Sequence, residues 1–157
     1  MENNRFAGLV EYIEKGIGII SCTGIRVAEC RDRYVKLMMP IEKNKNHIGI
    51  MYAGSLFIIG EVSGGAIFGT SFDYTRYYPV AKEVSIRFRR PALSDVSLEV
   101  EMSEERVTEI QGRVEEEGKA DFRLDLEIND IKGETVSLIQ GTWQLRKIPE
   151  GMTVPWL

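Results

Sequence analysis

The stretch from Met51 to Phe68 is apolar around nearly its whole circumference if it forms an α-helix. Its apolar side chains leave no wide polar stripe; they are Met51, Ala53, Leu56, Phe57, Ile58, Ile59, Val62, Ala66 and Ile67. A helix without a polar face must be covered on several sides by the rest of the protein, so it belongs in a core. The remaining sequence therefore has to supply a curved layer of structure that encloses this helix.

Strand signals dominate on both sides of the central helix. Before it, residues 25–41 favour extended structure with a turn at residues 31–33. After it, the strands predicted from alternating or β-branched residues are 84–88, 96–102, 120–128 and 134–146. A turn at residues 129–133 joins the last two strands into a hairpin. The sequence therefore predicts a mainly antiparallel sheet.

Two shorter helices are predicted outside the central one. Residues 103–117 are typical of a surface helix that ends at Gly118. An amphipathic helix near the N-terminus ends at Gly16, and its apolar face consists of Phe6, Leu9, Val10 and Ile13. This order of elements predicts an α+β fold in which the sheet wraps around one long central helix. The length of 157 residues fits a single domain spanning residues 1–157.

Composition excludes several classes of protein. A net charge of −4 argues against a non-specific nucleic-acid binder. The longest apolar run is interrupted by Glu61 and several glycines, and the N-terminus lacks a secretory signal, so we expect a cytoplasmic protein without a membrane span. Cys22 and Cys30 are expected to be reduced thiols rather than a disulfide. With the lone His47 they cannot form a standard zinc site, so no metal or cofactor is predicted.

Glu61 is the one charged residue within the central helix, and no Lys or Arg lies between Lys45 and Arg76. A buried carboxylate must be hydrogen-bonded, paired with a charge from elsewhere, or raised in pKa. A raised pKa in a cleft suits a general base. The alternative is a carboxylate at the exposed rim of the helix or bonded to a turn. Both interpretations stay open on these grounds alone.

The segment before the helix offers a second chemical element. Gly49 and Gly54 permit close approach of the backbone, and the first N–H groups of a helix have no partner within it. Such N–H groups can hold an oxyanion or a carbonyl oxygen. Alternatively, the glycines only shape a turn and Asn46 only caps the helix.

The residues around the helix start resemble the hot-dog thioesterase signature of the phenylacetyl-CoA thioesterase type, Asn-x-x-Gly-x-x-His-Gly-Gly-x-x-(Leu/Phe)-x-x-x-(Asp/Glu). The matching positions are Asn46, Gly49, Tyr52-Ala53-Gly54, Leu56-Phe57 and Glu61. Residues 86–92 resemble the family's strand that ends in Arg-Pro, and residues 141–147 resemble its closing strand. Over residues 25–147, the order of elements is similar to the thioesterase-like domain fused to some N-acetyltransferases.

The resemblance implies a hot-dog fold and a hydrolase for acyl-CoA or acyl-carrier thioesters, with each site formed across a homodimer interface and further assembly into a tetramer left open. Glu61 would activate water or attack the thioester, the N–H of Gly54 would hold the oxyanion, and Asn46 would orient water or the substrate carbonyl. Gly49 and Ala53 would line the bound substrate. Tyr52 stands where the family often has histidine; its hydroxyl can donate a hydrogen bond but is a poor base at neutral pH.

The predicted strand at residues 84–90 places Ser85, Arg87 and Arg89 on one face. Arg87 and Arg89 could contact the phosphates of coenzyme A, or they could simply form a solvated face. Two alternatives to hydrolysis remain. One is a catalytically silent hot-dog domain that binds acyl-CoA or serves assembly, which the missing histidine favours. The other is the hydratase or dehydratase branch of the fold, which uses an Asp/His pair, although His47 has no matching aspartate nearby.

Overall fold

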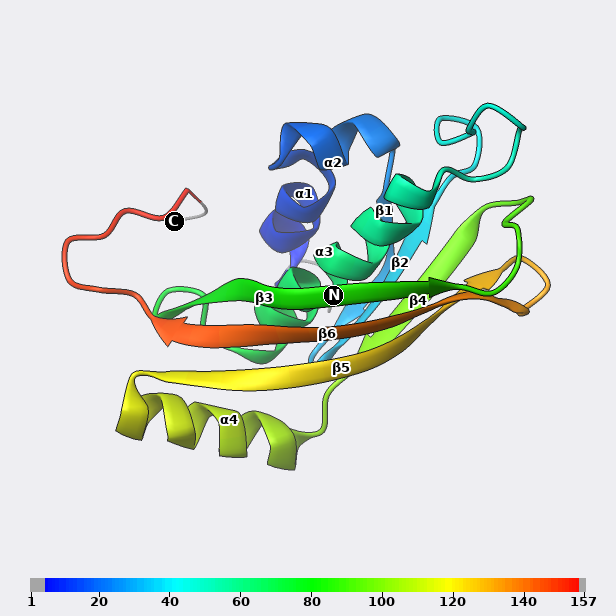
Figure 1. Cartoon of the computed structure of the whole chain (residues 1–157). Coiled ribbons are helices and arrows are strands. Elements are labelled where there is room, and N and C mark those ends of the chain that lie inside the picture. The colour runs from blue at the N-terminus through cyan, green and yellow to red at the C-terminus, as the bar shows by residue number, and fades with distance from the viewer. Residues whose placement is uncertain (1–4, 156–157) are drawn as a thin grey trace.

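The computed structural model describes residues 5–155. Within that range the chain forms four helices and six strands (Figure 1): α1 (Ala7–Lys15), α2 (Gly18–Thr23), β1 (Arg26–Arg31), β2 (Tyr34–Met39), α3 (Ala53–Ser71), β3 (Tyr77–Phe88), β4 (Val96–Glu101), α4 (Glu104–Glu117), β5 (Lys119–Asp130) and β6 (Thr135–Lys147). The predicted α+β class is therefore confirmed. The two helices that were predicted to end at Gly16 and Gly118 are α1 and α4, and each ends at the residue before its glycine.

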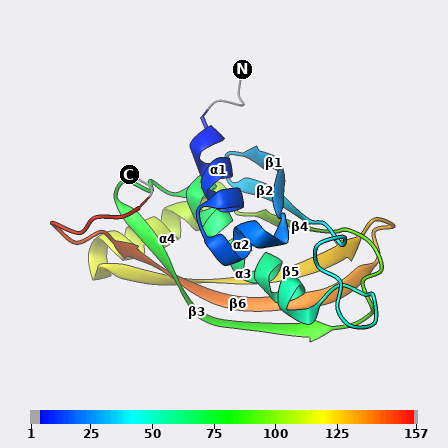
Figure 2. The ribbon, with the colours of Figure 1, turned by 90° about the horizontal axis from the view of Figure 1, so that it is seen from above.

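One six-stranded sheet curves around α3. The strand order is β1-β2-β4-β5-β6-β3, and every neighbouring pair is antiparallel. Figures 1 and 2 show α3 lying across the concave side of this sheet. The expectation of a sheet wrapped around a central helix is thus confirmed. β3 and β1 are the two edge strands.

α3 is long and apolar enough to cross a membrane by composition, but about two thirds of it is buried inside the protein. Two of its glycines allow it to lie close against β6. A Cβ on Gly60 would be 2.4 Å from Ile139 Cδ1, and a Cβ on Gly64 would be 2.1 Å from the Trp143 ring. Only glycine permits this approach. The contact of Gly60 and Gly64 with β6 also fixes the rotation of α3 about its axis. Successive residues on a helix are turned by about 100°, so the residue after each glycine points away from β6.

α4 fills a gap in the sheet. β4 pairs with β5 only through residues 96–98 and 128–130, so the rest of β5 separates from β4. The side chain of Ser103 accepts a hydrogen bond from the backbone N–H of Arg106 and caps α4, whose Ile110 and Val114 are buried in the core. Arg106 donates a hydrogen bond to the carbonyl oxygen of Arg123 on β5. The helix therefore replaces part of the missing strand pairing.

α1 and α2 lie on a side of α3 that the sheet does not cover (Figures 1 and 2). The Glu14 carboxylate accepts a hydrogen bond of 2.9 Å from the backbone N–H of Val27 and ties α1 to β1. α2 was not predicted, because six residues are too short for a helical period to show. β3 begins at Tyr77 rather than at the predicted residue 84, because Pro79 and two charged residues interrupt the strand signal. Proline is tolerated there because β3 is an edge strand.

Candidate active site

Glu61 lies in the middle of α3 and is partly buried. Among residues 5–155, no side chain or backbone N–H donates a hydrogen bond to its carboxylate, and no cation pairs with it. Burial raises the pKa of this carboxyl above its ordinary value of 4.5. The alternative of a carboxylate bonded to a turn is therefore wrong for this residue. An unpaired carboxylate with a raised pKa is suited to accept a proton.

Glu61 lines a cavity of about 390 Å³ between α3 and the N-terminal helices. Its floor is one face of α3, from Glu61 to Gly69, and its walls come from α1, α2 and the start of β3. The lining residues other than Glu61 are Arg5, Gly8, Leu9, Tyr12, Ile13, Ile17, Ile20, Val62, Gly65, Ala66, Phe68, Gly69, Tyr74 and Pro79. A mainly apolar pocket of this size with a few polar groups is typical of a small-molecule site.

The start of α3 forms a second, exposed element. The backbone N–H groups of Ala53 and Gly54 have no acceptor within the described part of the chain, as expected for the first turn of a helix. Tyr52 precedes the helix, is 58% exposed, and makes no side-chain cap. Its ring lies against Gly54, where an added Cβ would be 2.4 Å from Tyr52 Cε1. The two free N–H groups can hold an oxygen atom that carries negative charge.

Asn46 organises the loop before α3 rather than the helix itself. Its side-chain oxygen accepts hydrogen bonds from the N–H groups of Ile48, at 2.9 Å, and Ile50, at 3.3 Å. Gly49 adopts φ +82° inside this loop, a conformation that favours glycine. The idea that Asn46 caps the helix is wrong, because the residue before the helix is Tyr52. The amide nitrogen of Asn46 has no partner among residues 5–155 and is available to a substrate or water.

Asn44, which the sequence analysis missed, fastens this loop to the helix. Its buried amide donates to the carbonyl oxygens of Thr23 and Pro40, at 2.8 and 2.6 Å, and accepts from Ser55 Oγ at 2.8 Å. Its backbone oxygen accepts from the N–H of Tyr52 at 2.7 Å. Nothing in the local sequence marks Asn44, which lies between two lysines in a polar loop. The one available signal is Ser55, a polar residue inside an apolar run.

The structure does not bring Glu61 and Gly54 of one chain together. They are seven residues apart on a continuous helix, which corresponds to roughly 10 Å along its axis. A base and an oxyanion donor that act on one carbonyl group must each lie within about 3–3.5 Å of the reacting atoms. The two elements of one chain therefore cannot act on the same thioester.

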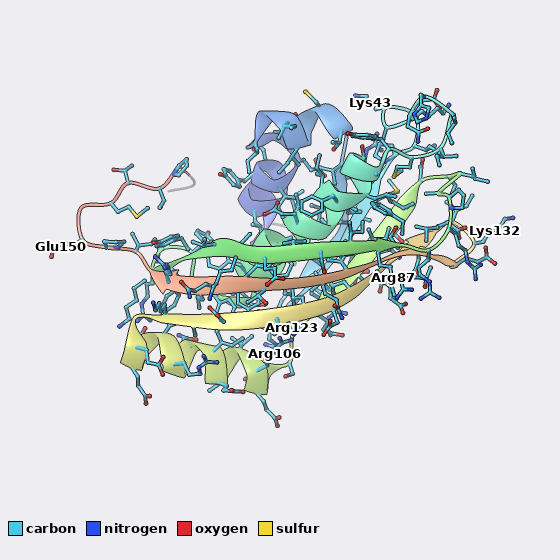
Figure 3. All side chains as sticks on the ribbon, in the orientation of Figure 1. Lys43, Arg87, Arg106, Arg123, Lys132 and Glu150 are labelled. Carbon is cyan, nitrogen blue, oxygen red and sulfur yellow. The ribbon has the colours of Figure 1, made fainter. Side chains whose placement is uncertain are left out.

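Arg87 and Arg89 lie away from the Glu61 cavity. Val84 and Ile86 pack against the core, so Arg87, which alternates with them on β3, lies on the outer face of the sheet. Figure 3 shows it there, near the end of the strand. Arg89 follows the strand and its N–H donates to the carbonyl oxygen of Val136 at 2.8 Å. Both side chains are exposed, and neither forms an ion pair with a described residue.

Other chemically reactive groups lie outside this region. Cys22 and Cys30 are free thiols, and burial raises the pKa of Cys30 to about 11, so its thiolate is not formed at neutral pH. His47 is exposed in the loop before α3. Within residues 5–155, no three His, Cys, Asp or Glu side chains lie close enough together to hold a metal ion.

Comparison with known proteins gives the family. The sequence model of a domain of unknown function, DUF4442, matches residues 17–145. The chain belongs to this family. A Pseudomonas aeruginosa protein of unknown function, described as a probable thioesterase, is 41% identical to this DUF4442 chain; the match covers 88% of this chain and 93% of that one, with a TM-score of 0.85.

More distant structures show how the DUF4442 chain is folded. A Haemophilus influenzae thioesterase is 12% identical with a TM-score of 0.69, and the match covers 92% of each chain. A variant of a Staphylococcus aureus thioesterase is 18% identical with a TM-score of 0.67, and the match covers 83% of this chain and 99% of that one. At these identities only the fold is shared, and it is the hot-dog fold of thioesterases. No curated protein matches the chain.

Proposed function

We propose that this protein hydrolyses acyl thioesters of coenzyme A or of an acyl carrier, with Glu61 as the catalytic carboxylate. The observation that carries the proposal is an unpaired carboxylate of raised pKa on the central helix, opening into an apolar cavity. The fold is one that thioesterases use, and the 41% identical Pseudomonas aeruginosa protein is described as a probable thioesterase. A thioester is already activated, so one base and one oxyanion donor are enough for useful rates.

The reaction follows from these groups. Glu61 accepts a proton from a water molecule as the water oxygen attacks the thioester carbon, and the carbonyl oxygen becomes an oxyanion held by the N–H of Gly54 from a second protomer. The intermediate then expels the thiolate, which receives the proton from Glu61 and leaves as the free thiol. Direct attack by Glu61, followed by hydrolysis of the anhydride, gives the same products. A general base contributes about 10²–10⁴-fold and an oxyanion donor about 10²–10³-fold.

The distance between Glu61 and Gly54 supports a site built from two protomers. In this arrangement Gly54 of one protomer completes the site around Glu61 of its partner. β3 is an edge strand of 12 residues whose outer side is unpaired among the described residues, and long free edges favour pairing with a second chain. The N–H of Met51 donates to the carbonyl oxygen of Ala92 at 2.9 Å, so the residues just before α3 lie beside the segment that follows β3. The exposed apolar side chains Ile48, Tyr52, Phe57 and Phe88 occupy these segments. We therefore propose a homodimer, which can pair further into a tetramer.

The remaining predicted residues have supporting roles in this proposal. The amide nitrogen of Asn46 and the hydroxyl of Tyr52 would position water or the thioester carbonyl, and Gly49 and Ala53 would line the substrate. Arg87 and Arg89 are exposed cations that would contact the phosphates of coenzyme A. On its motif residues we propose that the protein lies near the phenylacetyl-CoA thioesterases and the domain fused to some N-acetyltransferases. We also propose a cytoplasmic location, which the absence of a secretory signal in the given sequence supports.

Hydrolysis by a Glu61→Gln variant tests the proposal. The variant keeps the shape of the side chain and removes the base, so release of free thiol from acyl-CoA should fall at least about 100-fold. Folding should be retained, because no described residue depends on the carboxylate for a hydrogen bond. Glu116→Gln, which changes an exposed carboxylate on α4, is the matched control and should hydrolyse like the wild type. Near-normal hydrolysis by Glu61→Gln would contradict the mechanism.

A silent acyl-CoA binder is the second candidate. The observation that favours it is Tyr52, which occupies the histidine position of the motif and packs its ring over Gly54. If the wild type hydrolyses no thioester but binds a non-hydrolysable acyl-CoA thioether, this second function replaces the first.

A further inference from the structure

The cavity beside Glu61 follows one face of α3 over a defined length. Its floor begins at Glu61 and ends at Gly69, with Gly65 midway between them. Eight residues of helix correspond to roughly 12 Å. At Gly69, α1 packs close against α3, since a Cβ there would lie 2.4 Å from Leu9 Cδ1. The space therefore follows α3 as a slot, with the Glu61 carboxylate near one end and Leu9 against the helix near the other.

Gly65 differs from Gly60 and Gly64 in the space that surrounds its Cα. A Cβ on Gly60 or Gly64 would collide with β6, whereas a Cβ on Gly65 would meet no atom within 4 Å. Glycine weakens a helix interior, and neither a turn nor close packing requires it at this position. The space that Gly65 leaves open belongs to the cavity.

Two of the polar lining side chains are exposed: Arg5 has a side chain that is 74% exposed and lies 4.0 Å from Asp32, and Tyr74 is 41% exposed. Most of the other lining side chains are apolar, and they include Ile13, Ile20, Val62, Ala66 and Phe68. A charged group beside these apolar side chains would lose its hydration without gaining a partner among them.

We infer that this slot binds the acyl chain of the substrate, and that the chain is unbranched, uncharged and about eight to ten carbons long, with Gly65 as the residue that sets the length. The inference rests on the proposed function, because it places the thioester carbonyl at Glu61. An extended alkyl chain advances roughly 1.25 Å per carbon, given a C–C bond of about 1.52 Å, so roughly 12 Å holds nine or ten carbons. Gly65 lies about 6 Å from Glu61 along the helix, which is the length of four or five carbons.

The test measures kcat/KM for acetyl-, butanoyl-, octanoyl-, decanoyl-, hexadecanoyl- and phenylacetyl-CoA. For the wild type, each added methylene should raise kcat/KM by about fourfold up to eight to ten carbons and then give no further gain. Gly65→Leu should fill the slot at its midpoint and lower the value for octanoyl-CoA by about 100-fold, while the value for butanoyl-CoA changes by less than about threefold. Leu9→Ala should move the optimum to longer chains.

Gly112→Leu is the matched control, because Gly112 is also a helix glycine with open space at Cβ but lies on exposed α4. It should leave the chain-length profile unchanged. Gly8→Leu fills the slot from the opposite wall, where a Cβ likewise meets nothing, and should repeat the effect if Gly65→Leu does not fold. A folded Gly65→Leu variant with the wild-type profile, or a wild type that prefers phenylacetyl-CoA to octanoyl-CoA, would overturn the inference.

Binding of S-octyl-CoA, a non-hydrolysable thioether, separates this inference from the proposed function. If the wild type hydrolyses nothing but binds S-octyl-CoA, and Gly65→Leu weakens that binding by at least about tenfold, the slot is an acyl site and the hydrolase proposal fails alone. If Glu61→Gln abolishes hydrolysis while Gly65→Leu changes neither profile nor binding, the hydrolase proposal stands and the slot does not hold the acyl chain.

Discussion

The two groups proposed to act on the thioester are the backbone N–H groups at the start of α3 and the carboxylate of Glu61. They lie on one helix but in very different surroundings. At the start of α3, a network around Asn44 and Asn46 fixes a loop by hydrogen bonds, and two backbone N–H groups are left open at the surface. In the middle of α3, Glu61 has no hydrogen bond from any described residue and faces an apolar slot. The first region is held by polar contacts, whereas the second is defined by packing.

Each environment suits the proposed role of its group, which is to bind an oxyanion at the helix start and to accept a proton at Glu61. An oxyanion needs donors that are already fixed in direction, and the loop network supplies that order. A general base needs a pKa near neutrality, and an apolar site without partners raises the pKa of a carboxyl.

Mixing two inactive variants should give the largest effect. Gly54→Leu blocks the helix start and Glu61→Gln removes the base, so each should lose at least about 100-fold in hydrolysis. If each site combines one region from each protomer, a mixed dimer contains one intact site, and co-refolded equal amounts should recover about a quarter of wild-type activity. Free-thiol release after co-refolding measures this. No recovery from mixtures shown to contain mixed dimers would place both regions in one protomer.

Removing the buried amide at the helix start should have the next largest effect. Asn44→Ala leaves Ser55 and two carbonyl groups without partners and should lower the free energy of unfolding by about 2–4 kcal/mol. Asn46→Ala removes bonds only within a partly exposed loop and should lower it by about 1 kcal/mol or less. Urea unfolding of both variants gives the comparison. Equal losses would show that Asn44 does not hold the loop to α3.

The pH dependence of Glu61 should be the reverse of that of an ordinary ion-paired carboxylate. Between its unfolded pKa, near 4.5, and its higher folded pKa, the folded state binds more protons than the unfolded state, so wild-type stability falls as pH rises through that window. Glu61→Gln removes this loss, and its Tm relative to wild type should increase with pH over the same range. Hydrolysis by the wild type should rise with pH there, by about tenfold per unit on the acidic limb.

A Tm difference that is constant from pH 4 to 8 would mean that Glu61 titrates as an exposed carboxyl does.

Tyr52→Phe should give the smallest effect. The ring would still pack over Gly54, and only the hydroxyl that could bind substrate would be lost. Turnover should fall about two- to tenfold, the range for one hydrogen bond, with no change in Tm. If turnover is unchanged while Tyr52→Ala is impaired, the ring contributes packing alone.

Short-range patterns in the sequence were enough for most of the fold. The period-two alternation of β5 and the absence of a polar stripe on α3 are properties of consecutive residues, and they predicted a sheet around a buried helix. α2 escaped prediction because six residues are too short for a helical period to show, and the first half of β3 did so because Pro79 and two charged residues interrupt the strand signal. The motif from Asn46 to Glu61 predicted a type of chemistry, and that stays a proposal.

The site itself depended on contacts between distant segments. Spacing alone placed Glu61 in a buried helix without a nearby cation, and it placed Gly54 at a helix start. Only the tertiary structure decided that α1 and α2 leave a slot beside Glu61. It also decided that Asn44 binds the helix start to Thr23, 21 positions earlier in the chain, and that Gly65 opens space where Gly60 and Gly64 allow packing. The physical reason is that periodicity determines which face of an element is buried, whereas the volume beside that face depends on side chains brought there from elsewhere in the chain.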